Sequence, residues 1–245
     1  MSTDTTGPEP SFRSDVTVEL VKHSAADSDV LWAARVSTAG EQSLDELTKD
    51  PERSKGLINY LMRDRHGSPF EHNSMTFFVS APIFVFREFM RHRVGWSYNE
   101  ESGRYRELLP VFYVPAAERK LVQQGRPGKY EFVHGTEEQR ATVTAAMEES
   151  YRRSYGAYRE MLAAGVAREV ARATLPVGLF SSMYATCNAR SLMHFLGLRT
   201  QHELAKVPSF PQREIEMVGE RMEEHWRTLM PLTHAAFNAN GRVAP

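Results

Sequence analysis

The chain has 245 residues, 41% hydrophobic and 25% charged, and a formal net charge of −1. This size and composition are typical of a globular protein with one core. The near-zero net charge excludes a surface that is basic throughout, so we expect no nucleic-acid partner. No apolar run approaches the roughly 20 residues of a membrane helix, and no signal-peptide pattern opens the chain, so we expect no membrane association.

The single cysteine, Cys187, excludes a disulfide within the chain. Proteins of reducing compartments commonly lack disulfides. We therefore expect a cytoplasmic protein.

The first part of the chain predicts a tail, a strand and two helices. Residues 1–13 are rich in Ser, Thr, Pro and Gly, and we expect them to be disordered. Apolar residues alternate from Asp15 onward, as in a half-buried strand. A short helix is expected after an N-cap at Asp27 or Ser28. A second helix is expected where Asp50 precedes a proline, ending near residue 67.

The middle of the chain predicts a strand and two helices around an irregular excursion. Residues 75–79 alternate as a strand, and a helix is expected to start at Ala81-Pro82 and to carry residues 91–93 at its C-terminal end. Residues 114–138 hold glycines, prolines and charges, and are interpreted as an irregular excursion or arm. Residues 141–164 predict a long helix, whose tyrosines near one face favour packing over cofactor binding.

The last part predicts a strand at residues 180–187 and helices at residues 188–199 and 212–230. No internal repeat is visible. The expected fold class is α+β, with several helices packed around a modest, mostly antiparallel sheet in a single domain that covers residues 14–245.

The most informative segment, residues 91–105, holds several arginines, a histidine, two carboxylates, a serine and an amide. Arginine presents a rigid fork that matches phosphate, while a serine and a glycine backbone can donate hydrogen bonds from close range. A solvated charged loop would have a similar composition. The order of the residues favours a site for a small anion.

A second cluster, residues 66–72, places His66 and His72 on either side of a Ser-Pro turn. Two histidines and a glutamate invite a metal-site interpretation, but no third ligand stands at helical spacing, so we expect no metal. The functional alternative is that His66 and Ser68 present polar groups where a helix ends.

A third cluster begins at Arg168 and ends at Arg199. Arg168 and Arg172 share a helix face, as do Arg190 and His194. Arg190 and Arg199 are separated by about 180° around a helix of 3.6 residues per turn. One straight helix would therefore aim them at different pockets, which suggests active sites shared between subunits. A surface ion pair is the simpler interpretation of any one of these arginines.

Taken in order, the three clusters resemble the flavin-dependent thymidylate synthases. The pattern Arg-His-Arg, eight residues, Ser, one residue, Arg-Tyr is similar to the family signature, and the matching stretch covers roughly residues 34–215. The resemblance implies methylation of dUMP to dTMP with FAD, NADPH and methylenetetrahydrofolate, in a homotetramer with shared active sites.

The resemblance also implies site residues. Arg199 is the expected catalytic residue, which binds and activates the uracil base. FAD is expected to contact Ser37, His66, Ser68, Arg91, His92, Arg93, Glu100, Asn188, Ala189, Arg190 and His194. Substrate is expected to contact Glu88, Phe89, Met90, Arg91, Glu100, Glu101, Ser102, Gly103, Arg104, Arg172 and Arg199.

Two stretches depart from the family pattern. Glu88 stands where the family commonly has Gln, and its charge beside a phosphate or uracil is unfavourable unless it pairs with Arg87 or Arg91. Residues 200–211 delay the Gln-Arg-Glu-Ile stretch that the family places soon after its arginine.

The mechanism follows from the residues available. Cys187 lies in a predicted buried strand, where it is expected to be an inert apolar residue rather than a nucleophile. Activation of the uracil is then assigned to the charge of Arg199. Two alternatives stay open: another FAD enzyme that acts on a nucleotide, and a helical nucleic-acid-binding protein.

Overall fold

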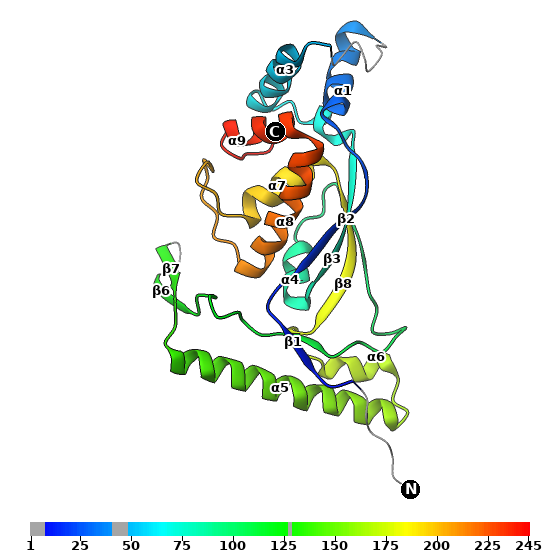
Figure 1. The fold of residues 1–245 in the computed structure, drawn as a ribbon. Helices are drawn as coiled ribbons and strands as arrows, with labels where there is room; N and C mark the ends of the chain where they lie inside the picture. Colours follow the sequence, from blue (N-terminus) through cyan, green and yellow to red (C-terminus); the bar gives the residue numbers. More distant parts are fainter. Residues whose placement is uncertain (1–7, 41–48, 127–128) are drawn as a thin grey trace. The chain divides into compact units, whose positions relative to one another are not determined.

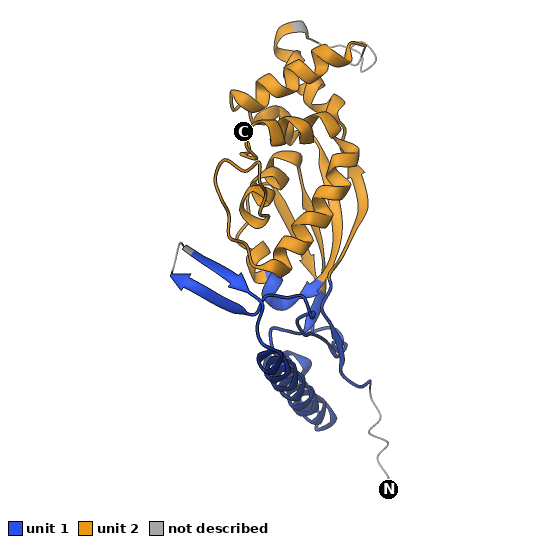
Figure 2. Cartoon of the chain, turned by 60° about the vertical axis from the view of Figure 1, so that its left-hand side comes forward, with its two compact units in different colours: residues 1–15, 81–86, 101–181 blue, residues 16–80, 87–100, 182–245 orange. Residues whose placement is uncertain are grey.

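The computed structural model describes residues 8–40, 49–126 and 129–245. The chain forms two compact units, coloured separately in Figure 2. Unit 1 comprises Met1–Asp15, Ala81–Phe86 and Glu101–Ser181, and unit 2 comprises Val16–Ser80, Arg87–Glu100 and Ser182–Pro245. The predicted α+β class with mostly antiparallel strands is confirmed.

Unit 2 holds most of a four-stranded sheet in the order β2-β3-β8-β4 (Figure 1). Its strands are β2 (Thr17–Ser24), β3 (Ser74–Pro82), β4 (Trp96–Glu100) and β8 (Phe180–Cys187). The pairs β2–β3 and β4–β8 are antiparallel. On β3, Met75, Phe77 and Val79 are fully buried, which explains the alternation in the sequence. β4 was not predicted.

Unit 2 also contains helices. They are α1 (Asp27–Ala39), α3 (Pro51–Arg63), the 3₁₀ helix η1 (Ser68–Glu71), α7 (Ala189–Arg199), α8 (Arg213–Leu229) and α9 (Pro231–Ala239). In Figure 1, α8 lies against β2 and is packed between α7 and α9. The helices predicted at residues 188–199 and 212–230 are confirmed, whereas α9 was not predicted.

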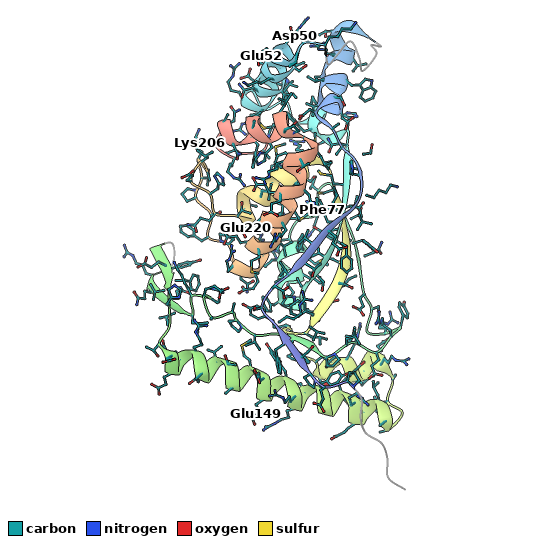
Figure 3. All side chains as sticks on the ribbon, viewed as in Figure 1. Asp50, Glu52, Phe77, Glu149, Lys206 and Glu220 are labelled. Atoms are coloured by element: carbon teal, nitrogen blue, oxygen red, sulfur yellow. The ribbon has the colours of Figure 1, made fainter. Side chains whose placement is uncertain are left out.

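Helix starts follow the capping residues in two cases. Asp50, labelled in Figure 3, caps α3 by accepting a hydrogen bond from the Arg53 amide at 3.0 Å. Asn188 caps α7 in the same way through the Ser191 amide at 2.9 Å. The predicted cap at Asp50 is confirmed, whereas no cap was predicted for the helix at residues 188–199.

The predicted cap of α1 was wrong. The N-cap is Ala26, and Asp27 is the first helical residue. The Asp27 carboxylate instead accepts hydrogen bonds from the amides of Leu232 and Thr233, at 2.8 and 2.9 Å, in the first turn of α9. Asp27 and Leu232 are 205 residues apart in the sequence, so local spacing could not predict this contact.

The helix α4 (Ile83–Phe89) is shorter than predicted at both ends. Ala81 and Pro82 are the last residues of β3, because the strand continues into them. Arg91, His92 and Arg93 lie in the turn beyond the helix, not on it.

Unit 1 is built around α5 (Glu137–Ala163), followed by the short α6 (Arg168–Ala171) and the 3₁₀ helix η2 (Arg172–Thr174). Its core contains Tyr151, Tyr155 and Tyr158 of α5, so the predicted packing stripe is confirmed. Because the α-helix ends at Ala171, Arg168 and Arg172 do not share one regular helix, contrary to prediction.

Strands also occupy two segments of unit 1 that were predicted to be irregular. β6 (Val122–Arg126) and β7 (Lys129–Val133) form an antiparallel hairpin within the 114–138 excursion. β1 (Ser11–Arg13) pairs in parallel with β5 (Val111–Tyr113), so this part of the predicted disordered tail is ordered. Residues 1–7 of that tail lie outside the described residues.

Within the described part of the chain, no helix is long and apolar enough to cross a membrane.

Candidate functional site

The Arg-His-Arg motif occupies the turn between α4 and β4. The Tyr98 hydroxyl donates to the backbone carbonyls of Phe89 and His92, at 3.1 and 2.8 Å, and so fixes the turn. Burial raises the pKa of Tyr98 far above its usual value, which keeps this donor protonated. Arg91 and Arg93 are exposed, and neither pairs with a carboxylate of the described residues. Two guanidinium groups are therefore available to an anion.

Phe89 and Met90 differ in how they could serve a ligand. The Phe89 ring is fully buried and stacks on Phe195, with ring centroids 4.8 Å apart. Met90 is 39% exposed. Of these two predicted substrate contacts, only Met90 presents a side chain at the surface.

Arg199 ends α7 and is held by two side chains from the α4 region. Its Nη1 donates to the Glu88 carboxylate at 2.5 Å, and its Nε donates to His92 Nε2 at 3.1 Å. Glu88 thus pairs with Arg199, and not with Arg87 or Arg91, the two partners considered from the sequence. The carboxylate that departs from the family pattern therefore orients the predicted catalytic arginine.

The contact with Arg199 requires His92 to accept a hydrogen bond, so its ring is neutral. Burial, followed by the charges of Arg199 and His194, lowers the pKa of His92 from 6.5 to about 4. The imidazole is therefore an acceptor throughout the neutral range.

The pKa of His92 predicts a pH dependence of stability. Between pH 6.5 and about 4 the unfolded chain binds a proton at His92 that the folded chain does not. The free energy of unfolding should therefore fall as the pH is lowered through this window. We expect His92→Gln to reduce that slope in urea titrations between pH 7 and pH 4. An unchanged slope, or an NMR titration of the ring near pH 6.5, would contradict the assignment.

Arg190 lies in the first turn of α7 and has a different set of partners. Its Nη1 donates to the Glu71 carboxylate at 2.5 Å, and its Nε donates to the Pro245 carbonyl at 2.7 Å. A Cβ on Gly67 would lie 2.5 Å from the Arg190 guanidinium carbon, so a larger residue there would displace the guanidinium from this position. The predicted divergence of Arg190 and Arg199 agrees with these separate partners.

The start of α7 is stabilised by two asparagines. Asn188 accepts from Ser191, and Asn73 accepts from the Ala189 amide at 2.8 Å. His194 lies on the same helix with part of its side chain exposed, and desolvation of the covered part of the ring, followed by the charge of Arg190, lowers its pKa. Sequence reasoning missed the roles of Glu71 and Asn73, although both lie within or beside the 66–72 cluster.

The other residues predicted to contact FAD lie at the surface of unit 2. Ser37, His66, Ser68 and Glu100 are exposed. The His66 ring stacks on Tyr60, with centroids 5.6 Å apart, and Glu100 is the last residue of β4. Their polar groups are accessible to a ligand.

The remaining predicted substrate contacts belong to unit 1. Gly103 is buried, and a Cβ there would lie 3.3 Å from the Arg172 Cδ, so the arginine stem passes close to the glycine. Arg104 pairs with Glu169 at 2.7 Å, and its backbone amide donates a hydrogen bond to the Ser102 hydroxyl oxygen at 3.3 Å. Arg172 is exposed, and the structure pairs it with no described carboxylate. Glu101 pairs with Arg106 at 3.2 Å.

The donor chemistry of these residues fits anionic ligands. Arg91, Arg93 and Arg172 offer guanidinium groups that pair with no carboxylate in the described ranges, and such groups suit phosphate oxygens. No group of three or more His, Cys, Asp or Glu side chains among the described residues could hold a metal ion. The residues therefore fit a diphosphate cofactor and a nucleotide.

The fold and the site define a class: an α+β protein with arginines near its helix ends whose guanidinium groups could bind anions. The family model described as "Thymidylate synthase complementing protein" matches residues 19–232. The chain belongs to this family, the flavin-dependent thymidylate synthases.

Individual relatives are similar over nearly the whole chain. A "Flavin-dependent thymidylate synthase" of Streptomyces avermitilis is 86% identical over 237 residues, covering 97% of this chain and 96% of the relative. A protein of the same description from Tropheryma whipplei strain TW08/27 is 58% identical over 239 residues, covering 97% and 98%. The crystal structure of the UMP/dUMP methylase PolB from Streptomyces cacaoi with 5-Br UMP has a TM-score of 0.89 at 55% identity, covering 97% and 100%.

Proposed function

We propose that the chain methylates dUMP reductively to dTMP, with methylenetetrahydrofolate as carbon donor and NAD(P)H, written as NADPH in the assays below, as the source of electrons through FAD. The observation that carries the proposal is Arg199, which a carboxylate and a neutral histidine hold at the end of α7. It lies in a chain whose single thiol is buried.

Arg199 would bind the uracil base and stabilise negative charge that develops on it. Methylation at C5 requires an electron-rich ring, and a fixed cation beside N3 and O4 favours the ionised form. The side chain is only 19% exposed, so its charge acts in a partly desolvated setting. Glu88 and His92 orient the fork before the substrate arrives.

The nucleotide phosphate would be bound by Arg91, Ser102, Gly103, Arg104 and Arg172. Arg91 and Arg172 have no acidic partner among the described residues, and the missing side chain of Gly103 lets the Arg172 stem pass close to its backbone. Arg104 would exchange its exposed contact with Glu169 for the phosphate. Exposed ion pairs of this kind contribute little to stability, so the exchange costs little.

FAD would be bound by residues of unit 2. Arg91, His92 and Arg93 come from the turn, and Asn188, Ala189, Arg190 and His194 come from the N-cap and helix of α7. The exposed residues Ser37, His66, Ser68 and Glu100 complete the proposed set. When bound and reduced, FAD supplies the hydride that completes the methyl group. The protein positions the ligands and supplies charge.

Cys187 is a poor candidate for a nucleophile. It is 2% exposed, and burial raises the pKa of its thiol far above the ordinary value. A thiolate, which is the attacking form, is therefore scarce at neutral pH.

We expect Cys187→Ala to retain substantial methylation activity. The smaller side chain leaves a small cavity, which should lower the free energy of unfolding by about 1 kcal/mol. Steady-state assays and urea titrations of the two proteins would measure both effects. Complete loss of activity in a folded variant that binds FAD would indicate a thiolate mechanism.

Tritium release from dUMP labelled at C5 tests the proposed reaction. Purified protein with FAD, methylenetetrahydrofolate and NADPH should release tritium and form dTMP, and omission of any one component should abolish product. UMP should be assayed in parallel, because the solved relative is described as a UMP/dUMP methylase. A colourless protein that binds no flavin and releases no tritium would refute the proposal.

We further propose a cytoplasmic homotetramer with active sites shared between subunits. Arg190 and Arg199 contact different elements from opposite ends of α7, which supports two pockets per helix. The single buried thiol suits a reducing compartment.

A further inference from the structure

Residues 242–245, which we call the brace segment, follow α9 and run along α7 within unit 2. Lys206, labelled in Figure 3, anchors the approach to this segment by donating its amide to the Gly241 carbonyl at 2.9 Å. The Arg242 carbonyl then passes close to α7, since a Cβ on Gly197 would lie 3.1 Å from that oxygen. The segment therefore touches the helix that carries Arg190 and Arg199.

The first residue of the brace segment, Arg242, is 3% exposed, and both terminal nitrogens of its guanidinium group donate hydrogen bonds. It donates to both carboxylate oxygens of Glu223, at 2.6 and 2.7 Å, and to Asn238 at 2.8 Å. Burial alone would raise the pKa of Glu223, but the hydrogen bonds from Arg242 and His234 lower it to about 2. The ion pair is thus preserved at all physiological pH values.

Arg242 also reaches the residue that follows Arg199. Its Nη2 donates to the Thr200 hydroxyl at 3.1 Å, and this hydroxyl donates to the Leu196 carbonyl at 2.7 Å. Thr200 is 4% exposed, and its carbonyl accepts from Ser209 at 2.5 Å. The backbone immediately after Arg199 is therefore fixed in position by a buried charged group.

Arg242 adopts a backbone conformation that favours glycine, with a φ of 55°. An L residue with a long side chain occupies this region at a cost and only where the surroundings enforce it. The hydrogen bonds of the Arg242 side chain to Glu223, Asn238 and Thr200 hold its backbone in this conformation. The direction of the brace segment is therefore coupled to the Arg242 ion pair.

At its other end, the brace segment contacts Arg190. The Pro245 carbonyl accepts from Arg190 Nε at 2.7 Å, and Arg65 donates to the carbonyls of Val243 and Ala244, at 2.7 and 3.1 Å. Pro245 is buried. Arg190 is thus oriented by a backbone carbonyl on one side and by Glu71 on the other.

We infer that the brace segment positions both ends of α7: Arg242 positions Arg199 through Thr200, and residues 243–245 position Arg190. Neither effect involves contact between the segment and a ligand. The inference rests on the proposed function, because it assigns the two arginines to the nucleotide and to FAD. Misplacement of a binding group by about 1 Å can cost on the order of a hundredfold in rate, so such support has a measurable effect.

Two variants test the two ends separately. Thr200→Val removes the hydroxyl contact and leaves the Arg242–Glu223 pair intact. We expect it to lower kcat about tenfold and to weaken dUMP binding in calorimetry, with FAD affinity within about twofold of wild type. A chain that ends at Arg242 should weaken FAD binding about tenfold in fluorescence titrations, with kcat at saturating FAD close to wild type.

Asp27→Asn is the matched control, because it weakens the cap of α9 without contact to α7. It should lower Tm and leave kcat, dUMP affinity and FAD affinity unchanged in the folded fraction. If the two test variants likewise lose only Tm, the brace segment is structural support alone and the inference is wrong. A wild-type protein that neither binds FAD nor methylates dUMP would overturn the proposed function and the inference together.

Discussion

Arg199→Lys should lose most of its turnover, on the order of a hundredfold, and keep its fold and bound FAD. The guanidinium of Arg199 contacts Glu88 and His92 through different nitrogens, at 2.5 and 3.1 Å. A lysine ammonium is a single point on a flexible stem and cannot reproduce that planar fork. The base would then meet a cation that is less well aligned. Steady-state assays with dUMP, together with the flavin absorbance spectrum, measure the two parts of this prediction.

Arg87→Lys is the control for this substitution. Arg87 is exposed on α4, next to Glu88, and is not assigned to a ligand. The same chemical change there should leave kcat and KM within about twofold of wild type. Turnover of Arg199→Lys at the wild-type rate would remove Arg199 from the catalytic role, and loss of flavin would make it a cofactor residue instead.

Arg190→Ala and Arg199→Ala should each be nearly inactive alone and regain activity when their subunits are mixed. The two arginines have separate partners, Glu71 with Pro245 and Glu88 with His92. If each pocket takes them from different chains, random exchange gives about one quarter of the pockets both intact arginines. Mild dissociation, reassembly and a dTMP assay would detect this recovery.

The matched control mixes Arg190→Ala with the double variant Arg190→Ala/Arg199→Ala. No pocket then receives an intact Arg190, so no recovery is expected, and any activity would reflect contamination. Mass spectrometry of differently tagged chains establishes that subunits exchanged. A monomeric protein by light scattering would refute shared sites, and so would mixed oligomers that have exchanged subunits but have no activity. Either result would leave the assignment of each arginine to its ligand in place.

Local patterns predicted the elements whose residues interact mainly with near neighbours. The alternation of Met75, Phe77 and Val79 predicted β3, because every second side chain faces the core. Asp50, followed by a proline, predicted the start of α3, because its carboxylate bonds the amide three residues on. β4 was missed because its polar residues hide the alternation of Trp96 and Tyr98, whose rings stack 5.7 Å apart.

The contacts that orient the candidate site were beyond such patterns. Glu88 and Arg199 are 111 residues apart, and Glu71 and Arg190 are 119 apart. Spacing along a helix separated Arg190 from Arg199, but it could not show which carboxylate each would meet. The resemblance to a family supplied ligands for these residues. The structure adds their partners, including Asn73 at the start of α7.

The segment 91–105 is continuous in sequence but is divided between the two compact units, since Glu100 belongs to unit 2 and Glu101 to unit 1. Its first half depends on Tyr98 for the shape of a turn, and its second half depends on the close approach of Gly103 and Arg172. If these fifteen residues were transferred into another scaffold, they would keep the sequence signature. They would lose the contact between Gly103 and Arg172, which lies outside the segment. A protein engineer who seeks this binding chemistry would have to transfer two frameworks rather than one loop.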